Sequence, residues 1–173
     1  MLEREVRLYA WVMDYLRKLC DGIDESEMDV QPAPGLNTPR WILGHLAVAG
    51  DFAAKWSGAP TQCPRAWYSA FGPGSKPEAP PSPPPTKQEL LAVIEKVHDA
   101  VTAAVKVATP EALAKPHTFQ PVVEAFPTIA DFLAHLMTTH PMLHLGQLSV
   151  WRRLRGSRRC WGFDRANGAL QVG

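Results

Sequence analysis

The stretch TIADFLAHLMTTHPMLHLGQLSVWRRLR, residues 128–155, decides the fold. Apolar residues and two histidines recur in it at three- and four-residue steps, which places them on one side of an α-helix. These positions are Ile129, Phe132, Leu133, Leu136, His140, Leu143, His144, Gln147 and Trp151. His140 and His144 are four residues apart, so their side chains are neighbours on the helix and can share one metal ion. Such a pair is half of a metal site, and the rest of the chain must supply a third ligand.

Length and composition predict one ordinary globular domain over residues 1–173. The chain has 173 residues, of which 46% are hydrophobic and 20% are charged, and this is enough for a single sizeable core. A formal net charge of +1 gives no support for a nucleic-acid partner. The sequence has no run of about 18 apolar residues and no signal-peptide pattern, so we expect no membrane partner and a cytoplasmic location.

Three further helices are expected, near residues 2–21, 38–56 and 86–107. The second follows the string NTP at 37–39, in which a polar cap precedes a proline that needs no hydrogen-bond partner in the first turn. Thr86 and Glu89 have the spacing of a capping box at the start of the third helix. Together with the helix over 128–155, these segments predict an all-α four-helix bundle.

The connection over residues 57–85 is the longest and contains the proline-rich run PEAPPSPPP. Such a run is stiff and has little to bury. A crossover of this length lets the third helix run parallel to the second, which a short loop does not allow. Trp67, Tyr68 and Phe71 within it either pin the loop to the bundle or cover the mouth of a pocket. Residues 156–173 are glycine-rich and polar, and we expect an irregular tail there.

Three of the six histidines are expected to lie outside a metal site. His135 precedes His140 by five residues, which on an α-helix turns it away from the side that carries His140 and His144. His117 follows a proline in a loop and is expected at the surface. His98 lies at the edge of the third helix's apolar side, and we expect a hydrogen-bonded residue at the edge of the core, although a part in the site stays open.

His45, on the apolar side of the second helix, joins His140 and His144 as an inward-facing histidine. Each of the three can be a core histidine with its own hydrogen-bond partner, but polar partners on those sides are few. One shared metal ion would satisfy all three, and the spacing favours such a site. Pro141 directly follows His140, removes one helical hydrogen bond and frees the carbonyl of Met137, so we expect a kink there.

Two strings of the sequence resemble the DinB/YfiT-like family. NTPRWILGHLA, which contains His45, is similar to that family's Asn-x-x-x-Trp-x-x-Gly-His-Leu segment. HPMLHLGQLSVWRRLRG, which contains His140 and His144, is similar to its His-x-x-x-His-x-Gly-Gln signature. The resemblance implies a four-helix bundle with up-down-down-up topology and a divalent metal ion held by three histidines, which fall on His45, His140 and His144. Pro141 departs from the family pattern and can shift His140.

The resemblance implies a metal-dependent enzyme that acts on a small molecule, and we expect a thiol-dependent transferase or a hydrolase. Characterised relatives include transferases and an isomerase that use mycothiol or bacillithiol, and the iron-binding domain of a sulfoxide synthase. The implied cofactors are a divalent ion (zinc, nickel, iron or manganese) and, for thiol chemistry, a low-molecular-weight thiol. The alternative is a catalytically silent metal-binding bundle with a structural or sensing role. The relatives also imply a homodimer.

Trp41, Gln147 and Arg152 are candidates for substrate binding or for supporting the ligands. Trp41 would shape a pocket wall. Gln147, one turn beyond His144, either orients a ligand or a histidine N–H, or is a helix-face amide bonded to a neighbouring helix. Arg152 either binds a substrate carboxylate or belongs to a solvated cationic helix end that complements the helix dipole.

Overall fold

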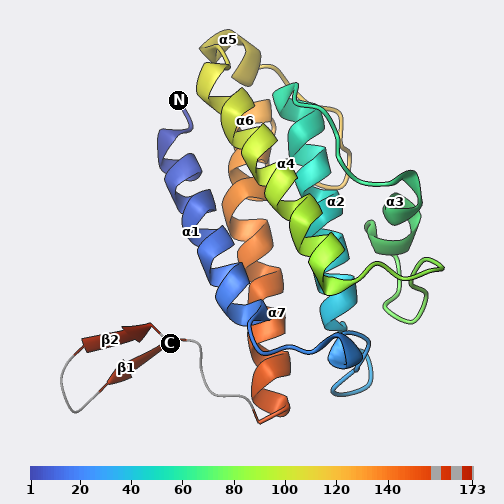
Figure 1. The fold of residues 1–173 in the computed structure, drawn as a ribbon. Helices are drawn as coiled ribbons and strands as arrows, with labels where there is room; N and C mark the ends of the chain where they lie inside the picture. The colour runs from blue at the N-terminus through green and yellow to red at the C-terminus, as the bar shows by residue number, and fades with distance from the viewer. Residues whose placement is uncertain (157–160, 165–168, 173) are drawn as a thin grey trace.

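Four long helical segments lie side by side in the computed structural model, which describes residues 1–156, 161–164 and 169–172 (Figure 1). The long segments are α1 (Glu3–Cys20), α2 (Pro39–Ser57), α4 (Lys87–Val107) and the continuous run of α6 (Ile129–Ala134), η2 (His135–Thr139) and α7 (His140–Leu154). The short helices are η1 (Glu25–Glu27), α3 (Arg65–Phe71) and α5 (Pro110–Leu113). The expected all-α four-helix bundle is confirmed, and each long segment begins and ends within one residue of its expected bounds.

The direction of the chain in each long helix can be followed by colour in Figure 1. The chain descends through α1, ascends through both α2 and α4, and descends through the run from α6 to α7. α2 and α4 therefore run in the same direction, which the long connection between them allows. The two helices approach closely at Gly50 of α2, where an added Cβ would lie 2.6 Å from Val97 Cγ1 of α4.

Side-chain caps fix where three of these helices begin. The Thr38 hydroxyl accepts a backbone N–H in the first turn of α2. Thr86 and Glu89 form a reciprocal capping box at the start of α4, and Thr128 and Asp131 form another at the start of α6. Each cap satisfies a backbone N–H that the helix itself cannot, which is worth about 0.5–2 kcal/mol. These local signals explain why the helix starts could be predicted from the sequence.

The irregularity expected at Pro141 takes the form of a π-helical turn just before it. In η2 the N–H of His140 bonds to the carbonyl of His135, five residues earlier. Because Pro141 has no N–H to complete the α-helical pattern, one wider turn absorbs the missing hydrogen bond. The wider turn rotates His135 toward His140, and the centroids of their rings lie 5.5 Å apart.

The crossover over residues 57–85 contains a short helix, α3, that the sequence did not predict. Trp67 and Phe71 of α3 are buried, so these aromatic residues pin the crossover to the bundle. The Phe71 ring packs directly on Gly44 of α2, where an added Cβ would lie 2.3 Å from the ring. The missing side chain at Gly44 therefore lets α3 approach α2 closely.

A buried carboxylate on α2 holds the same crossover from a second point. Asp51 accepts the backbone N–H groups of Gln62 and Cys63 and the hydroxyl of Tyr68, each at 2.7 Å. Burial and the nearby carboxylate raise the pKa of the Cys63 thiol, and the same causes raise the pKa of Tyr68 to about 12. Both groups stay protonated at neutral pH, so this cluster has a structural role and Cys63 is no ready nucleophile.

The C-terminal region contains a small antiparallel sheet, which corrects the expectation of an irregular tail over 156–173. β1 (Trp161–Asp164) pairs with β2 (Ala169–Val172), and Trp161 lies opposite Val172. Strand pairing depends on a partner backbone rather than on local composition, so the glycine-rich sequence did not reveal it. Within the described part of the chain, none of the helices is long and apolar enough to span a bilayer.

Candidate metal centre

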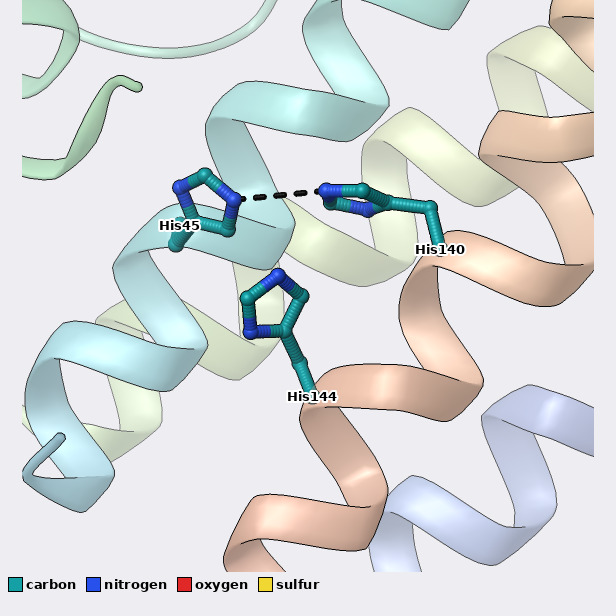
Figure 2. Close-up of side chains that lie close together, drawn as sticks. All are labelled: His45, His140 and His144. Carbon is teal, nitrogen blue, oxygen red and sulfur yellow. Dashed lines mark hydrogen bonds between the residues drawn. The ribbon is translucent and has the colours of Figure 1, made fainter. Parts of the chain in front are cut away.

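Three histidine rings from two helices face one another between α2 and α7 (Figure 2). His45 comes from α2, and His140 and His144 come from the N-terminal part of α7. One ring nitrogen of each lies within 4.8 Å of the others, and His45 Nε2 and His140 Nε2 are 3.3 Å apart. Among the described residues, this is the one group of three or more His, Cys, Asp or Glu side chains that is close enough to share an ion.

The backbone at the end of α3 orients the ring of His45. Its Nδ1–H donates to the carbonyl oxygen of Phe71 at 2.7 Å, which leaves the lone pair of Nε2 facing His140. The close approach of α3 at Gly44 brings this carbonyl within reach. Gly44 and His45 therefore act together, because the glycine admits α3 and the histidine binds the carbonyl that α3 presents.

Trp41 packs on the face of His45, one helical turn away. The two rings are nearly parallel, with centroids 4.7 Å apart and an interplanar angle of 8°. The Trp41 indole N–H donates to Ser75 Oγ at 2.9 Å, and Ser75 in turn donates to the carbonyl of Gly72. Trp41 thus forms a wall beside the histidines, as expected, and the crossover fixes its position.

All three imidazoles are neutral at pH 7. Burial lowers the pKa of His45. Burial and the neighbouring imidazoles lower the pKa of His140 to about 3, and burial and His45 lower the pKa of His144 to about 4. The cluster contains no carboxylate, and His140 Nδ1 is buried without a hydrogen-bond partner. Neutral imidazole is the form that binds a metal ion, so the lowered pKa values keep these rings in the form that can act as ligands.

Gln147 connects His144 to the loop before α2. Gln147 Oε1 lies 3.3 Å from His144 Nδ1 and accepts the amide N–H of Asn37 at 3.0 Å. Both interpretations of Gln147 from the sequence therefore apply, because its side-chain oxygen contacts the ring of His144 and also accepts a hydrogen bond from Asn37, in the loop before α2. An N–H on His144 Nδ1 leaves its Nε2 free as a ligand atom.

The geometry fits a divalent ion bound by three histidines. Two nitrogens that bind a tetrahedral ion at about 2.0–2.1 Å are about 3.3–3.4 Å apart, and the distance between His45 Nε2 and His140 Nε2 is 3.3 Å. The third histidine, His144, is within reach of the same point. Three neutral nitrogen ligands leave coordination positions open, which is typical of catalytic rather than structural metal sites.

Arg152 lies away from the histidines and is engaged with α1. Its Nη1 donates to the carbonyl of Leu19 at 2.8 Å and also to the carbonyl of Asp21. These are free carbonyls at the C-terminal end of α1, where a positive charge is favourable. The side chain thus joins α1 to α7, and the structure gives no support for the substrate-binding role that the sequence left open.

His135 lies beside His140, although the sequence predicted that it turns away. Its ring contacts that of His140, with centroids 5.5 Å apart, and it stacks on Phe126 at 4.3 Å. Its Nδ1 lies 2.7 Å from Thr139 Oγ1. The prediction that His135 turns away is wrong because it assumed α-helical spacing, whereas η2 brings residues five apart together. Pro141 was the available signal, since a proline inside a helix often accompanies such a turn.

His117 and His98 have opposite outcomes. His117 is only 2% exposed, so its expected surface position is wrong. Its ring stacks on that of Phe132, with centroids 4.4 Å apart, and forms hydrogen bonds with the backbone of Phe119 and Phe126 in its own loop. His98 contacts Tyr9 and lies 3.0 Å from Asp99 on α4, which confirms the core-edge prediction and separates it from the histidine cluster.

A cavity of about 200 Å³ opens beside His45 and His140. His135 also lines it, and the other lining side chains are apolar. Part of the wall comes from the loop between α5 and α6 through Phe119 and Val122, a contribution that no motif in the sequence indicated. The candidate ligands thus have a space next to them that a small molecule can enter.

The comparisons with known proteins agree with this fold. The model of the DinB superfamily matches residues 8–148, and no curated protein matches the sequence. Among solved structures, the chain is similar to YfiT from Bacillus subtilis, described as a probable metal-dependent hydrolase with an unusual four-helix bundle topology. The TM-score is 0.62 at 17% sequence identity, over 90% of this chain and 88% of that chain, so the likeness shows a shared fold. Because the family model spans most of its length, this chain belongs to the DinB superfamily.

Proposed function

We propose that this protein is a metal-dependent enzyme that hydrolyses a small molecule at the three-histidine centre. The observation that carries the proposal is the convergence of three neutral imidazoles, without a carboxylate, beside a cavity that reaches His45 and His140. YfiT, described as a probable metal-dependent hydrolase, shares the fold and supports the same class of reaction. His45, His140 and His144 hold the ion, which is zinc, nickel, iron or manganese.

A divalent ion in such a centre supplies Lewis acidity, which lowers the pKa of a water or thiol and polarises a carbonyl group. The chain's own residues prepare the centre. Phe71 and Gln147 fix the tautomers of His45 and His144 through their ring N–H groups. Trp41 covers one face of His45. His135 lines the cavity and provides a ring nitrogen that can hydrogen-bond the substrate or its leaving group.

Hydrolysis fits the cavity better than transfer to a low-molecular-weight thiol. In hydrolysis, the oxygen of water bonds to the acyl carbon, the bond to the leaving group breaks, and the leaving group takes a proton from water. A small polar nucleophile such as water needs no binding groups of its own. Charged thiol cofactors need cationic partners, and no Lys or Arg is among the residues that line the cavity. Thiol-dependent transfer is therefore our second candidate, since the same ion would acidify a thiol.

We also propose that the protein is a cytoplasmic homodimer. Three exposed apolar residues follow one side of α7, namely Leu143, Val150 and Leu154, and such a patch is typical of protein interfaces. Trp151 of the same helix is buried and donates its indole N–H to the carbonyl of Val30. It therefore belongs to the core rather than to the patch. Light scattering at micromolar concentration would measure the mass, and a monomer would contradict this proposal.

The test of the main proposal begins with metal analysis of protein purified without an affinity tag. We expect about one divalent ion per chain, and we expect its loss in His144→Ala. The loaded protein is then mixed with 4-nitrophenyl acetate, and release of 4-nitrophenolate is compared between loaded protein, chelator-treated protein and His144→Ala. A parallel reaction contains cysteine and a chromogenic electrophile, which reports thiol transfer instead.

Each result separates one alternative. Hydrolysis that requires both the ion and His144 supports the proposal. Equal metal content in the parent protein and His144→Ala would show that the ion is bound elsewhere. Metal binding without hydrolysis but with thiol transfer would favour the second candidate. Metal binding with neither reaction would favour a catalytically silent bundle with a structural or sensing role.

A further inference from the structure

The cavity beside His45 and His140 has a wall that the metal chemistry does not require. Six apolar side chains form most of it: Val48, Phe52, Phe119, Val122, Phe132 and Leu136. The centroid of the Phe119 ring lies 5.3 Å from that of Phe52 and 5.6 Å from that of Phe132. Aromatic rings attract one another at centroid distances of about 4.5–7 Å in offset or edge-on arrangements. A flat aromatic group entering this space would find three rings to pack against.

The volume of the cavity limits the size of its occupant. It holds about 200 Å³, whereas an apolar cavity of about 150 Å³ is sufficient to bind benzene. A phenyl ring with one or two further atoms therefore fits. A bicyclic ring system exceeds this space unless a wall residue is removed.

The protein's own groups in the lining offer no partner to a charged occupant. The lining residues include no Lys, Arg, Asp or Glu, and their polar groups are the three histidines His45, His135 and His140. A charged group would lose its hydration without gaining a partner of opposite charge, which is costly. The histidines also define an orientation, because the polar end of a ligand finds its hydrogen-bond partners only at their side of the cavity.

The loop that closes the cavity is held in place before any ligand binds. His117 accepts the N–H of Phe119 at Nδ1 and donates from Nε2 to the carbonyl of Phe126. At the ends of the loop, Ile129 N–H donates to the carbonyl of Lys115 at 2.8 Å. A site that is already formed loses little entropy when it binds a ligand. This explains why a histidine is buried in a loop where the sequence suggested exposure.

We propose that this apolar cavity selects the substrate by binding an uncharged aryl group, of about the size of a benzyl group, on a neutral amide or ester. The aryl group packs among Phe52, Phe119 and Phe132, and the acyl group faces His45 and His140. The reaction part of this inference rests on the proposed hydrolysis, but the binding part does not. Binding of the aryl group is a property of the apolar walls, so it is retained in protein without a metal ion.

The test uses calorimetric titration of chelator-treated protein with phenylacetamide. We expect saturable binding, and we expect acetamide, which has the same polar end without the ring, to bind at least about tenfold more weakly. Phenylacetate and 2-phenylethylammonium carry the ring with a charge, and we expect both to bind at least about tenfold more weakly than phenylacetamide. Equal binding of acetamide and phenylacetamide, or of the charged and neutral ring compounds, would overturn the proposal.

Two variants with opposite expected effects locate the binding. Val122→Trp fills the cavity from the loop and should reduce phenylacetamide binding at least tenfold, whereas Val107→Trp, at a position 82% exposed at the end of α4, should leave it unchanged. Phe119→Ala enlarges the cavity and should shift the preference toward 1-naphthylacetamide. A gained preference cannot result from unfolding. Unchanged affinities in both cavity variants would overturn the proposal.

The outcomes also separate this inference from the proposed function. Aryl binding to chelator-treated protein, together with no hydrolysis by the loaded protein, supports the cavity and rejects the hydrolase. Hydrolysis that is equally fast for acetyl and phenylacetyl esters supports the hydrolase and rejects the cavity as the determinant of specificity.

Discussion

Two buried polar side chains on α2, Arg40 and His45, lie five residues apart and differ in their charge state. Arg40 is 4% exposed and keeps its charge, because its guanidinium donates to both oxygens of Asp29, to Glu25 and to the carbonyl of Pro85. His45 is 7% exposed and is neutral, because burial lowers the pKa of its ring and the cluster around it contains no carboxylate. The first site is complete without a ligand. The second brings ring nitrogens of three neutral imidazoles together, and its internal hydrogen bond, between His45 Nε2 and His140 Nε2, joins two groups that can both bind a metal ion.

The pKa shifts of the two sites express the same difference. Hydrogen bonds with Asp29 raise the pKa of Arg40, and burial opposes this rise without cancelling it. Burial lowers the pKa of His45, His140 and His144, and no carboxylate opposes that effect. A structural polar site satisfies its own hydrogen bonds, whereas a ligand site keeps acceptors available. Four substitutions or conditions test this difference, beginning with the largest expected effect.

Removal of one candidate ligand should have the largest effect, and it should act on metal binding. Mutation of a residue that only supports a metal ligand typically lowers metal affinity 10–100-fold. Loss of a ligand itself should have a larger effect, so His140→Ala should weaken zinc binding more than about 100-fold. A competition titration against a chromophoric chelator would measure this. His98→Ala is the matched control, because His98 pairs with Asp99 on α4 and should bind zinc normally. Equal affinity in His140→Ala would remove the basis for the centre.

Arg40→Ala should act on stability and spare metal binding. The variant loses buried charged hydrogen bonds and leaves the carbonyl of Pro85 without its donor, although Asp29 and Glu25 are exposed enough to regain water. We expect the free energy of unfolding to fall by about 2–3 kcal/mol in urea titrations. The exposed Arg7→Ala should change it by less than about 0.5 kcal/mol. A loss of zinc affinity larger than the loss of stability would show that the two sites are coupled.

Acidification should destabilise the metal-free protein through the histidines. In the unfolded chain the imidazoles have a pKa of about 6.5, whereas folded His144 and His140 have pKa values of about 4 and 3. Below pH 6.5 the unfolded chain therefore binds more protons, so the free energy of unfolding falls as pH decreases. The fall levels out only when the folded rings are protonated near pH 4 and pH 3.

The size of this effect is best measured as a difference between two proteins. We expect the parent protein to lose at least about 2 kcal/mol more than the double variant His140→Gln/His144→Gln between pH 7 and pH 4. Carboxylates also titrate in this range, but they are the same in both proteins and cancel. Parallel stability curves for the two proteins would show that the imidazoles are not held in the neutral form.

Gln147→Ala should have the smallest effect. Its Oε1 contacts His144 Nδ1, but the residue is exposed, so we expect a loss of about tenfold in zinc affinity, at the low end for a supporting residue. Gln88→Ala, an exposed glutamine in the first turn of α4, is the control and should have no effect. A loss as large as that of His140→Ala would mean that Gln147 is itself a ligand.

The sequence by itself determined the four long helices and the three histidines that come together. Helix starts depend on contacts between residues three apart, such as Thr128 with Asp131, and these contacts are visible in the chain order. Apolar periodicity shows which side of each helix is buried, so it also placed His45, His140 and His144 on inward sides.

Only the tertiary structure decided what surrounds those histidines. The carbonyl of Phe71 on His45, the burial of His117 and the engagement of Arg152 with α1 each join residues from different elements. The position of His135 beside His140 follows from the π-helical turn, which one proline indicates only weakly. Helical periodicity is a local property, whereas loop packing and cavity shape depend on contacts between distant segments. For that reason the ligands could be found from the sequence, and the cavity beside them could not.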